Sequence, residues 1–102
     1  MNQEDTSTII QKAAGILQTE HKDEKAFDQL FRLLAQAFEN KHYFCKIQGK
    51  RWAFLAGDDD MITPEKQLQL TRHYGILYDS PYDINAWHQV IEALKHYLEL
   101  RH

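Results

Sequence analysis

The segment over residues 41–57 alternates between apolar and polar side chains with period two, as a half-buried β-strand does. Gly49 stands near its midpoint, where a tight turn favours glycine. The pattern predicts a β-hairpin with a two-residue loop, either Gln48-Gly49 or Gly49-Lys50. Because an isolated two-stranded ribbon is marginal in water, we expect helices to cover its aromatic face. Both registers give that face the same residues: Tyr43, Cys45, Ile47, Trp52, Phe54 and Ala56.

Residues before the hairpin follow helical periodicity. Apolar side chains from Ile9 to Leu17 recur at the spacing of a first helix, which Asp5 or one of the next three residues could cap. A second helix is predicted over about residues 23–39, with Asn40 in the left-handed conformation that ends it. Its apolar stripe consists of Phe27, Leu30, Phe31, Leu34 and Phe38.

Two helix starts are predicted after the hairpin, each from a capping residue followed by proline at the first helical position. Thr63-Pro64 begins a third helix that stops at Gly75, and residues 76–78 then form an apolar connection. Ser80-Pro81 begins a fourth helix that runs to about Leu100. Its apolar arc, which we expect to face the core, contains Ile84, Trp87, Val90, Ile91, Leu94, Tyr97 and Leu98.

These elements predict an α+β fold in the order α-α-β-β-α-α, with four helices packed around one short antiparallel hairpin. A chain of 102 residues with 43% hydrophobic content is long enough for one core, so we expect a single domain over residues 1–102. Cys45 is the sole cysteine, which excludes an intrachain disulfide. The polar start and the absence of a long apolar run predict a cytoplasmic protein that does not span a membrane.

Negative charge is concentrated in the second half of the chain. The net charge is -3, and residues 1–57 carry eight Lys/Arg and seven Asp/Glu whereas residues 58–102 carry four and eight. Three consecutive aspartates follow the hairpin, and solvation alone is one explanation of such a run. The other, which we adopt, is an electrostatic site for a basic protein partner, formed by Asp58, Asp59, Asp60, Glu65, Asp79, Tyr82 and Asp83.

Positive charge is found on the hairpin, interleaved with its aromatic residues. This pattern is typical of surfaces on which the bases of single-stranded nucleic acid stack while cations meet phosphate. The alternative interpretation places the aromatics in the core and the cations on a solvated edge that discourages strand aggregation. The overall acidity makes nucleic acid the less favoured partner. The residues in question are Lys41, Lys46, Lys50 and Arg51.

Candidates for chemistry are weaker. His88, Glu92 and His96 share one helix face at a spacing that a metal site could use, but they lie in the polar arc, where solvated residues are expected. Cys45 near His42 suggests a thiol nucleophile, yet a cysteine in an alternating strand is usually buried, and no cysteine-hydrolase motif is present. We therefore predict no catalytic residue, no metal and no cofactor.

The function that these features favour is that of a small acidic protein-binding module. We expect an inhibitor or immunity-type protein that neutralises a basic partner such as a toxin nuclease, because blocking a cleft requires complementarity and no chemistry. Two alternatives remain open from sequence. One is a nucleic-acid-associated regulatory module that uses the basic hairpin, and the other is a small hydrolase or metal-binding protein.

Overall fold

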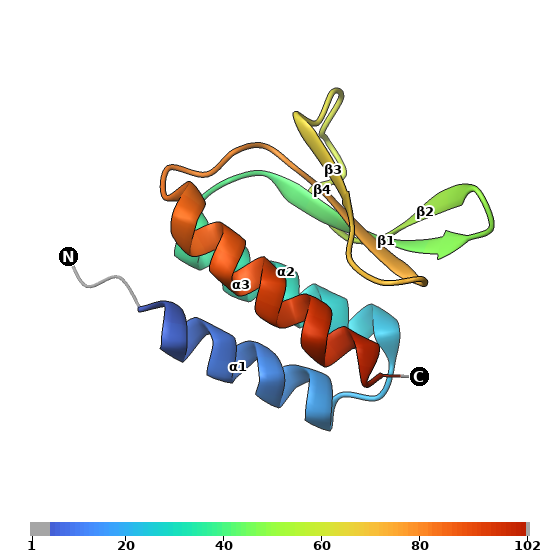
Figure 1. Ribbon diagram of the computed structural model, residues 1–102. Helices are drawn as coiled ribbons and strands as arrows, with labels where there is room; N and C mark the ends of the chain where they lie inside the picture. Colours follow the sequence, from blue (N-terminus) through green and yellow to red (C-terminus); the bar gives the residue numbers. More distant parts are fainter. Residues whose placement is uncertain (1–4, 102) are drawn as a thin grey trace.

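The computed structural model describes residues 5–101, and within that range the chain forms three helices and four strands in the order α-α-β-β-β-β-α. The strands form one antiparallel sheet in the order β2-β1-β4-β3. All three helices lie on one side of this sheet (Figure 1). The prediction of four helices around a two-stranded hairpin is therefore wrong. The elements are α1 (Thr6–Thr19), α2 (Asp23–Phe38), β1 (His42–Gln48), β2 (Arg51–Gly57), β3 (Lys66–Gln69), β4 (Tyr74–Tyr78) and α3 (Ile84–Glu99).

The hairpin is present as predicted, and its loop is Gly49-Lys50, because Gln48 pairs with Arg51. Gly49 has a φ of 64°, the left-handed conformation for which glycine is suited. A register shift follows between β1 and β2: Cys45 pairs with Phe54 whereas Phe44 pairs with Ala56. The extra residue of this bulge turns Ala56 to the opposite face from the one predicted.

The helices cover the face of the hairpin opposite to the one we predicted. The Phe44 ring lies 5.1 Å from that of Phe27 in α2, and the His42 ring lies 5.5 Å from that of Trp87 in α3, as distances between ring centroids. Because side chains alternate along a strand, Tyr43 and Cys45 must point away from the helices. The hairpin pattern points to the wrong face, because the helices cover the more polar side of β1, which carries His42, Phe44 and Lys46.

The segment predicted as a third helix is instead β3, a bend and the start of β4. The Thr63-Pro64 signal fits a helix start, but β4 pairs with β1 on one side and with β3 on the other, and this long-range pairing overrides local helix propensity. Residues 76–78, predicted as a connection, belong to a central strand. Tyr74, Ile76 and Tyr78 are buried against the helices at period two.

The remaining helices confirm the apolar patterns but not every boundary. Asp5 caps α1 by accepting a hydrogen bond from the backbone N–H of Thr8 at 2.8 Å. Glu39, and not Asn40, takes the left-handed conformation after α2. The predicted start of the last helix at Ser80-Pro81 is wrong, because Asp83 is the cap of α3.

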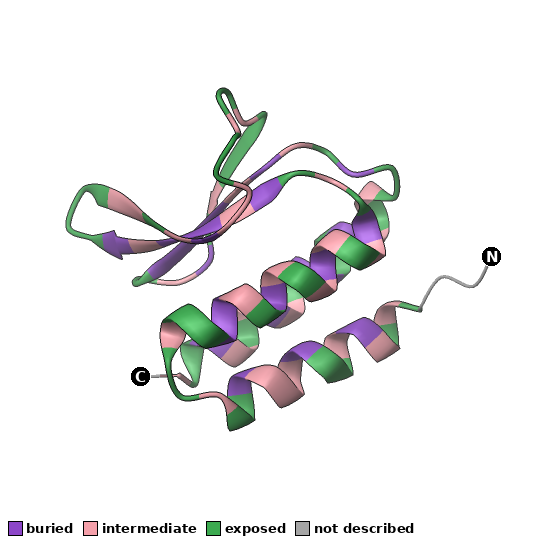
Figure 2. Cartoon of the chain, turned by 180° about the vertical axis from the view of Figure 1, so that it is seen from behind, coloured by how far each residue is buried: buried purple, intermediate pink, exposed green. Residues whose placement is uncertain are grey.

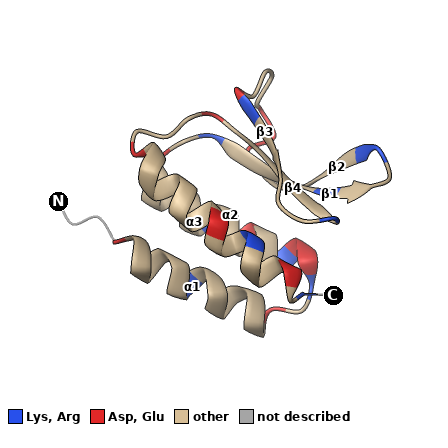
Figure 3. Ribbon diagram, viewed as in Figure 1, with Lys and Arg blue, Asp and Glu red and all other residues tan. Residues whose placement is uncertain are grey.

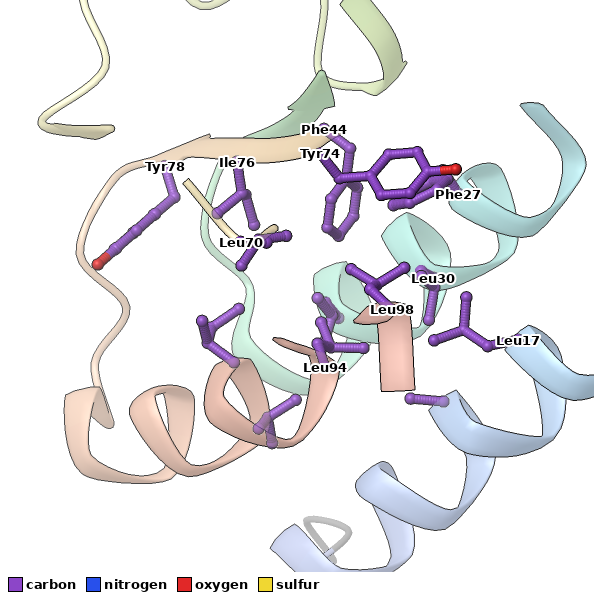
Figure 4. Close-up of a cluster of buried hydrophobic side chains, with 14 of the residues drawn as sticks. Leu17, Phe27, Leu30, Phe44, Leu70, Tyr74, Ile76, Tyr78, Leu94 and Leu98 are labelled. Atoms are coloured by element: carbon purple, nitrogen blue, oxygen red, sulfur yellow. The ribbon is translucent and has the colours of Figure 1, made fainter. Parts of the chain in front are cut away.

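The core lies between the sheet and the pair α2 and α3, and α1 packs against both helices from outside (Figure 1). Figure 2 shows the buried surfaces of these elements turned toward one another. Leu30 and Phe44 illustrate the contact: both are fully buried, and both belong to the cluster that fills this space (Figure 4). Over residues 5–101, no helix is both long and apolar enough to cross a bilayer.

Candidate functional site

Acidic residues gather at one end of the sheet because three strands meet the acidic loops there. β2 and β4 end at this side and β3 begins there, so the antiparallel pairing brings together loops that are distant in sequence. The N-terminus of α3 follows directly after β4. We call this region the acidic end, and its carboxylates are those of Asp58, Asp59, Asp60, Glu65, Asp79 and Asp83.

Most of these carboxylates also hold the loops in place. An Asp58 oxygen accepts the backbone N–H of His42 at 3.1 Å. Glu65 accepts the N–H of Ser80 at 2.7 Å, while its own N–H donates to Asp79 at 3.1 Å. The hydrogen bond from the Ser80 backbone lowers the pKa of Glu65. The acidic end is therefore a braced surface, in which the carboxylates are held at fixed positions.

Lys41 lies inside the acidic end. Its Nζ is 2.7 Å from an Asp60 oxygen, and both side chains are more than half exposed. The hydrogen bond and charge of Asp60 raise the pKa of Lys41, and Asp58 and Asp79 add to the effect. Asp59 is exposed and makes no hydrogen bond or ion pair with any residue from 5 to 101. Lys66, the first residue of β3, is a second cation at this end, and the two lysines offset only part of the local negative charge.

A groove runs along the helix side of the acidic end, between the start of α1, the end of α2 and the start of α3. Four carboxylates and one lysine line it: Asp5, Glu39, Asp79, Asp83 and Lys41. Tyr82 stands at its wall with a fully exposed side chain. We call it the acidic groove. The sequence pointed to three of these residues, Asp79, Tyr82 and Asp83, but Asp5 and Glu39 join them only through helix packing.

The four cations of the hairpin do not share one surface. Lys41 belongs to the acidic end, and Lys46 faces the helices, where its Nζ lies 3.4 Å from Asp23. Lys50 and Arg51 remain at the β1–β2 turn. Arg72, which sequence reasoning missed, lies in the neighbouring β3–β4 turn, because β1 and β4 pair side by side. We call Lys50, Arg51 and Arg72 the basic tip (Figure 3).

A polar cluster that the sequence did not predict joins the other ends of the helices. The Asp23 carboxylate accepts hydrogen bonds from Tyr74 at 2.7 Å and from Arg101 at 3.1 Å. The Arg101 guanidinium also donates to the carbonyls of Leu17 and His21, both at 3.0 Å. Burial, and then the Asp23 carboxylate, raise the pKa of Tyr74 to about 12. Every polar atom of this cluster is engaged within the protein, which indicates a structural role.

The residues considered for catalysis or metal binding are not assembled into such a site. His42 and Cys45 point to opposite faces of the sheet, and burial raises the pKa of the Cys45 thiol to about 11, so it is not a thiolate at neutral pH. His88, Glu92 and His96 lie exposed on α3. Among residues 5–101, no group of three or more His, Cys, Asp or Glu side chains is placed to hold a metal ion.

The face of the sheet turned away from the helices is apolar over β2, β1 and β4, whereas β3 adds the exposed Gln67 and Gln69. Phe54 stacks near Tyr43, with 5.5 Å between ring centroids, and the Trp52 indole lies directly over Gly75. No helix or loop packs over it as a layer in the part of the chain that the structure describes (Figure 1). We call this apolar part the open face. Its residues are Tyr43, Cys45, Ile47, Trp52, Phe54 and Leu77, of which Cys45 and Ile47 are already buried beneath their neighbours.

Comparison with protein families, with characterised proteins and with solved structures finds no match to this chain. Function must therefore be argued from the acidic end, the acidic groove, the basic tip and the open face.

Proposed function

We propose that this protein is a binding module that docks a basic protein partner on its acidic end, as an inhibitor or immunity-type protein does. The observation that carries the proposal is the convergence of six carboxylates from two separate loops, residues 58–65 and 79–83, at one end of the sheet. Lys41 and Lys66 are cations placed among them. A surface that carries mainly one sign of charge speeds association with a partner of the opposite charge and disfavours partners of the same charge.

The acidic groove adds a concave binding surface to the charged region. It has carboxylates on several sides and a fully exposed tyrosine, Tyr82, at its wall. An arginine or lysine of the partner would enter between Asp79 and Asp83, while the Tyr82 ring would add apolar contact area. Tyrosine and arginine are the residues that most often dominate the energy of protein interfaces. The proposed site therefore comprises Asp58, Asp59, Asp60, Glu65, Asp79, Tyr82 and Asp83.

The nucleic-acid alternative has weaker support. Of its four cations, Lys41 is paired with Asp60 and Lys46 with Asp23, so that only Lys50 and Arg51 lie together at an unengaged position. A single-stranded nucleic acid needs cations that follow its backbone across the surface.

The test uses the full chain as bait in extracts of the native cell, followed by association kinetics with the captured protein. In the acidic variant, Asp58, Asp59 and Asp60 are replaced by Asn, which keeps an acceptor oxygen for the His42 N–H. A matched control replaces three exposed glutamates elsewhere by Gln: Glu24, Glu92 and Glu99. Both variants change the net charge equally.

We expect the wild-type chain to capture a basic protein. The acidic variant should associate about tenfold more slowly with it and depend less on ionic strength, whereas the control should stay close to wild type. If the control slows association as much as the acidic variant does, net charge and not this surface is responsible, and the proposal is wrong. Capture of an acidic partner, with wild-type kinetics in the acidic variant, would also contradict it.

A further inference from the structure

The open face is a partly exposed apolar surface centred on Phe54. Phe54 is 52% exposed, Trp52 is half-buried over Gly75, and Tyr43 and Leu77 are also half-buried. These side chains come from three adjacent strands, so they form one continuous surface rather than scattered positions. Contiguous apolar surface of this kind marks an interaction site.

Charges of opposite sign flank the two ends of the open face. The strands run antiparallel, so the β1–β2 and β3–β4 turns lie at one end and carry the basic tip. The acidic end lies at the opposite end of the same strands (Figure 3). Lys50, Arg51 and Arg72 make no ion pair with other residues from 5 to 101. The surface is therefore apolar in the middle, positive at one end and negative at the other.

We propose that a second copy of this chain covers the open face, in a twofold-symmetric dimer whose sheets pack face to face with opposed strand ends. A twofold axis that lies between the sheets and perpendicular to the strands places each basic tip over the acidic end of the other copy. An axis along the strands would place like charges together. Charge complementarity thus selects one arrangement of the two, and the aromatic side chains form its apolar centre.

Single-stranded nucleic acid is the other occupant that an aromatic sheet surface could take. Its bases would stack on Tyr43, Trp52 and Phe54, but its phosphates would need cations along the whole path. Cations that are not surrounded by carboxylates lie at one end only. At the other end Lys41 and Lys66 stand among carboxylates, which would repel phosphate. The charge distribution favours a second copy of the chain.

The first test is sedimentation equilibrium of the full chain over a range of concentrations. We expect the wild-type protein to approach twice the mass of the chain as its concentration rises. Phe54→Glu places a charge at the centre of the interface and should weaken the dimer about 30-fold or more. Leu100→Glu is the matched control, because Leu100 is also an exposed apolar residue, 71% exposed, but lies at the end of α3 on the helix side.

The second test reverses charges. One variant carries Lys50→Glu and Arg51→Glu, and the other carries Asp59→Lys and Asp60→Lys. In each variant alone, residues 50–51 and residues 59–60 carry the same sign of charge. These residues therefore repel each other where the basic tip meets residues 58–60 of the second copy, and the variant should be monomeric. An equimolar mixture restores opposite charges at both ends, so it should form a heterodimer. Circular dichroism of the separate variants confirms that each is folded.

Three results would overturn the proposal. A wild-type chain that stays monomeric at all concentrations has no such dimer. Equal weakening by Phe54→Glu and Leu100→Glu would place the interface elsewhere. A mixture of the two charge variants that does not associate would rule out opposed strand ends. If the monomeric wild-type chain instead binds a fluorescent single-stranded oligonucleotide, and Phe54→Glu abolishes this binding, nucleic acid is the occupant.

Discussion

His42 is a titratable side chain enclosed by aromatic rings. Its ring centroid lies 5.0 Å from that of Phe31, 5.8 Å from that of Phe44 and 5.5 Å from that of Trp87. Its Nδ1 is 3.3 Å from the carbonyl oxygen of Asn40, and its Nε2 has no hydrogen-bond partner among residues 5–101. Burial lowers the pKa of His42 to about 4, although the Asn40 carbonyl and the Asp58 charge oppose the shift. The folded protein therefore holds a neutral imidazole.

This burial predicts a specific loss of stability in mild acid. Because the pKa is lower in the folded state than the 6.5 of the unfolded chain, the unfolded state binds more protons between these values. The contribution of the neutral His42 to the free energy of unfolding is fully present above about pH 6.5. It declines as the pH falls toward 4, by a total on the order of 3 kcal/mol. Urea titrations from pH 7 to 4.5 measure it. In His42→Leu the free energy of unfolding should fall less as the pH is lowered through this window. If it falls as steeply as in wild type, the assignment to His42 is wrong.

Trp87 is the largest fully buried side chain. It touches rings from three elements, with centroid distances of 5.1 Å to Phe38 and 5.0 Å to Tyr78 in addition to its contact with His42. Trp87→Ala should lower the free energy of unfolding by about 3 to 5 kcal/mol, because the residual cavity cannot collapse between packed rings. His88→Ala, at the exposed neighbouring position, should stay within about 0.5 kcal/mol of wild type in the same urea titration. If Trp87→Ala lowers the free energy of unfolding by less than about 1 kcal/mol, the surrounding side chains must collapse into the cavity, contrary to this prediction.

At the scale of elements, local patterns predict the structure wherever the pattern and the tertiary contacts agree. The stripes that become α1, α2 and α3 each specify a buried face through their own spacing, and the alternation that becomes β1 and β2 specifies a hairpin. The error lies at β3, which has four residues, of which only Leu68 turns toward the core. So short a strand exists because β4 pairs with it, and no local signal carries that information.

The open face could not be predicted for a related reason. β1 has aromatic rings on both sides: His42 and Phe44 meet the helices, whereas Tyr43 faces outward. Period-two spacing identifies two faces but does not say which of them is covered. Only the position of β1 in the middle of a four-stranded sheet, with helices on one side, resolves this.

Gly75 provides a test of the open face at the level of the sheet. A Cβ there would overlap the Trp52 ring, so Gly75→Ala should displace the indole and cost about 1 to 3 kcal/mol of unfolding free energy. Gly15 is the matched control, because it lies inside α1 with open space around its Cα, and Gly15→Ala should stabilise the fold by about 0.5 to 1 kcal/mol. Thermal unfolding and tryptophan emission measure both. Equal effects of the two substitutions would contradict the placement of Trp52.

At the scale of the whole molecule, the sequence shows the charges but not their geometry. The run at residues 58–60 is visible in the chain, yet its proximity to Glu65, Asp79 and Asp83 follows only from where strands end. The same topology moves Lys41 into the acidic end and separates it from Lys50, although both belong to the hairpin. The fold thus brings the carboxylates of the candidate site together, whereas it distributes the cations of the hairpin to different surfaces.

The two proposals use the acidic end in different ways, and this predicts competition. In the proposed dimer, residues 58–60 meet the basic tip of the second copy, so a basic partner can dock there only when the dimer opens. The association rate per chain with the captured partner should therefore fall as the concentration of wild-type chain rises. The association rate of Phe54→Glu should stay high at every concentration, because this variant keeps the acidic end but does not form the dimer.

Stopped-flow measurements at chain concentrations below and above the dimer dissociation constant would test this competition, with Leu100→Glu as the variant that still dimerises. We expect the association rate per chain of Leu100→Glu to fall with rising chain concentration, as that of wild type does. If the wild-type rate per chain is independent of concentration while sedimentation shows a dimer, the second copy leaves the acidic end accessible. The dimer would then pack its sheets without engaging that end, because residues 58–60 cannot meet a basic partner and a basic tip at the same time.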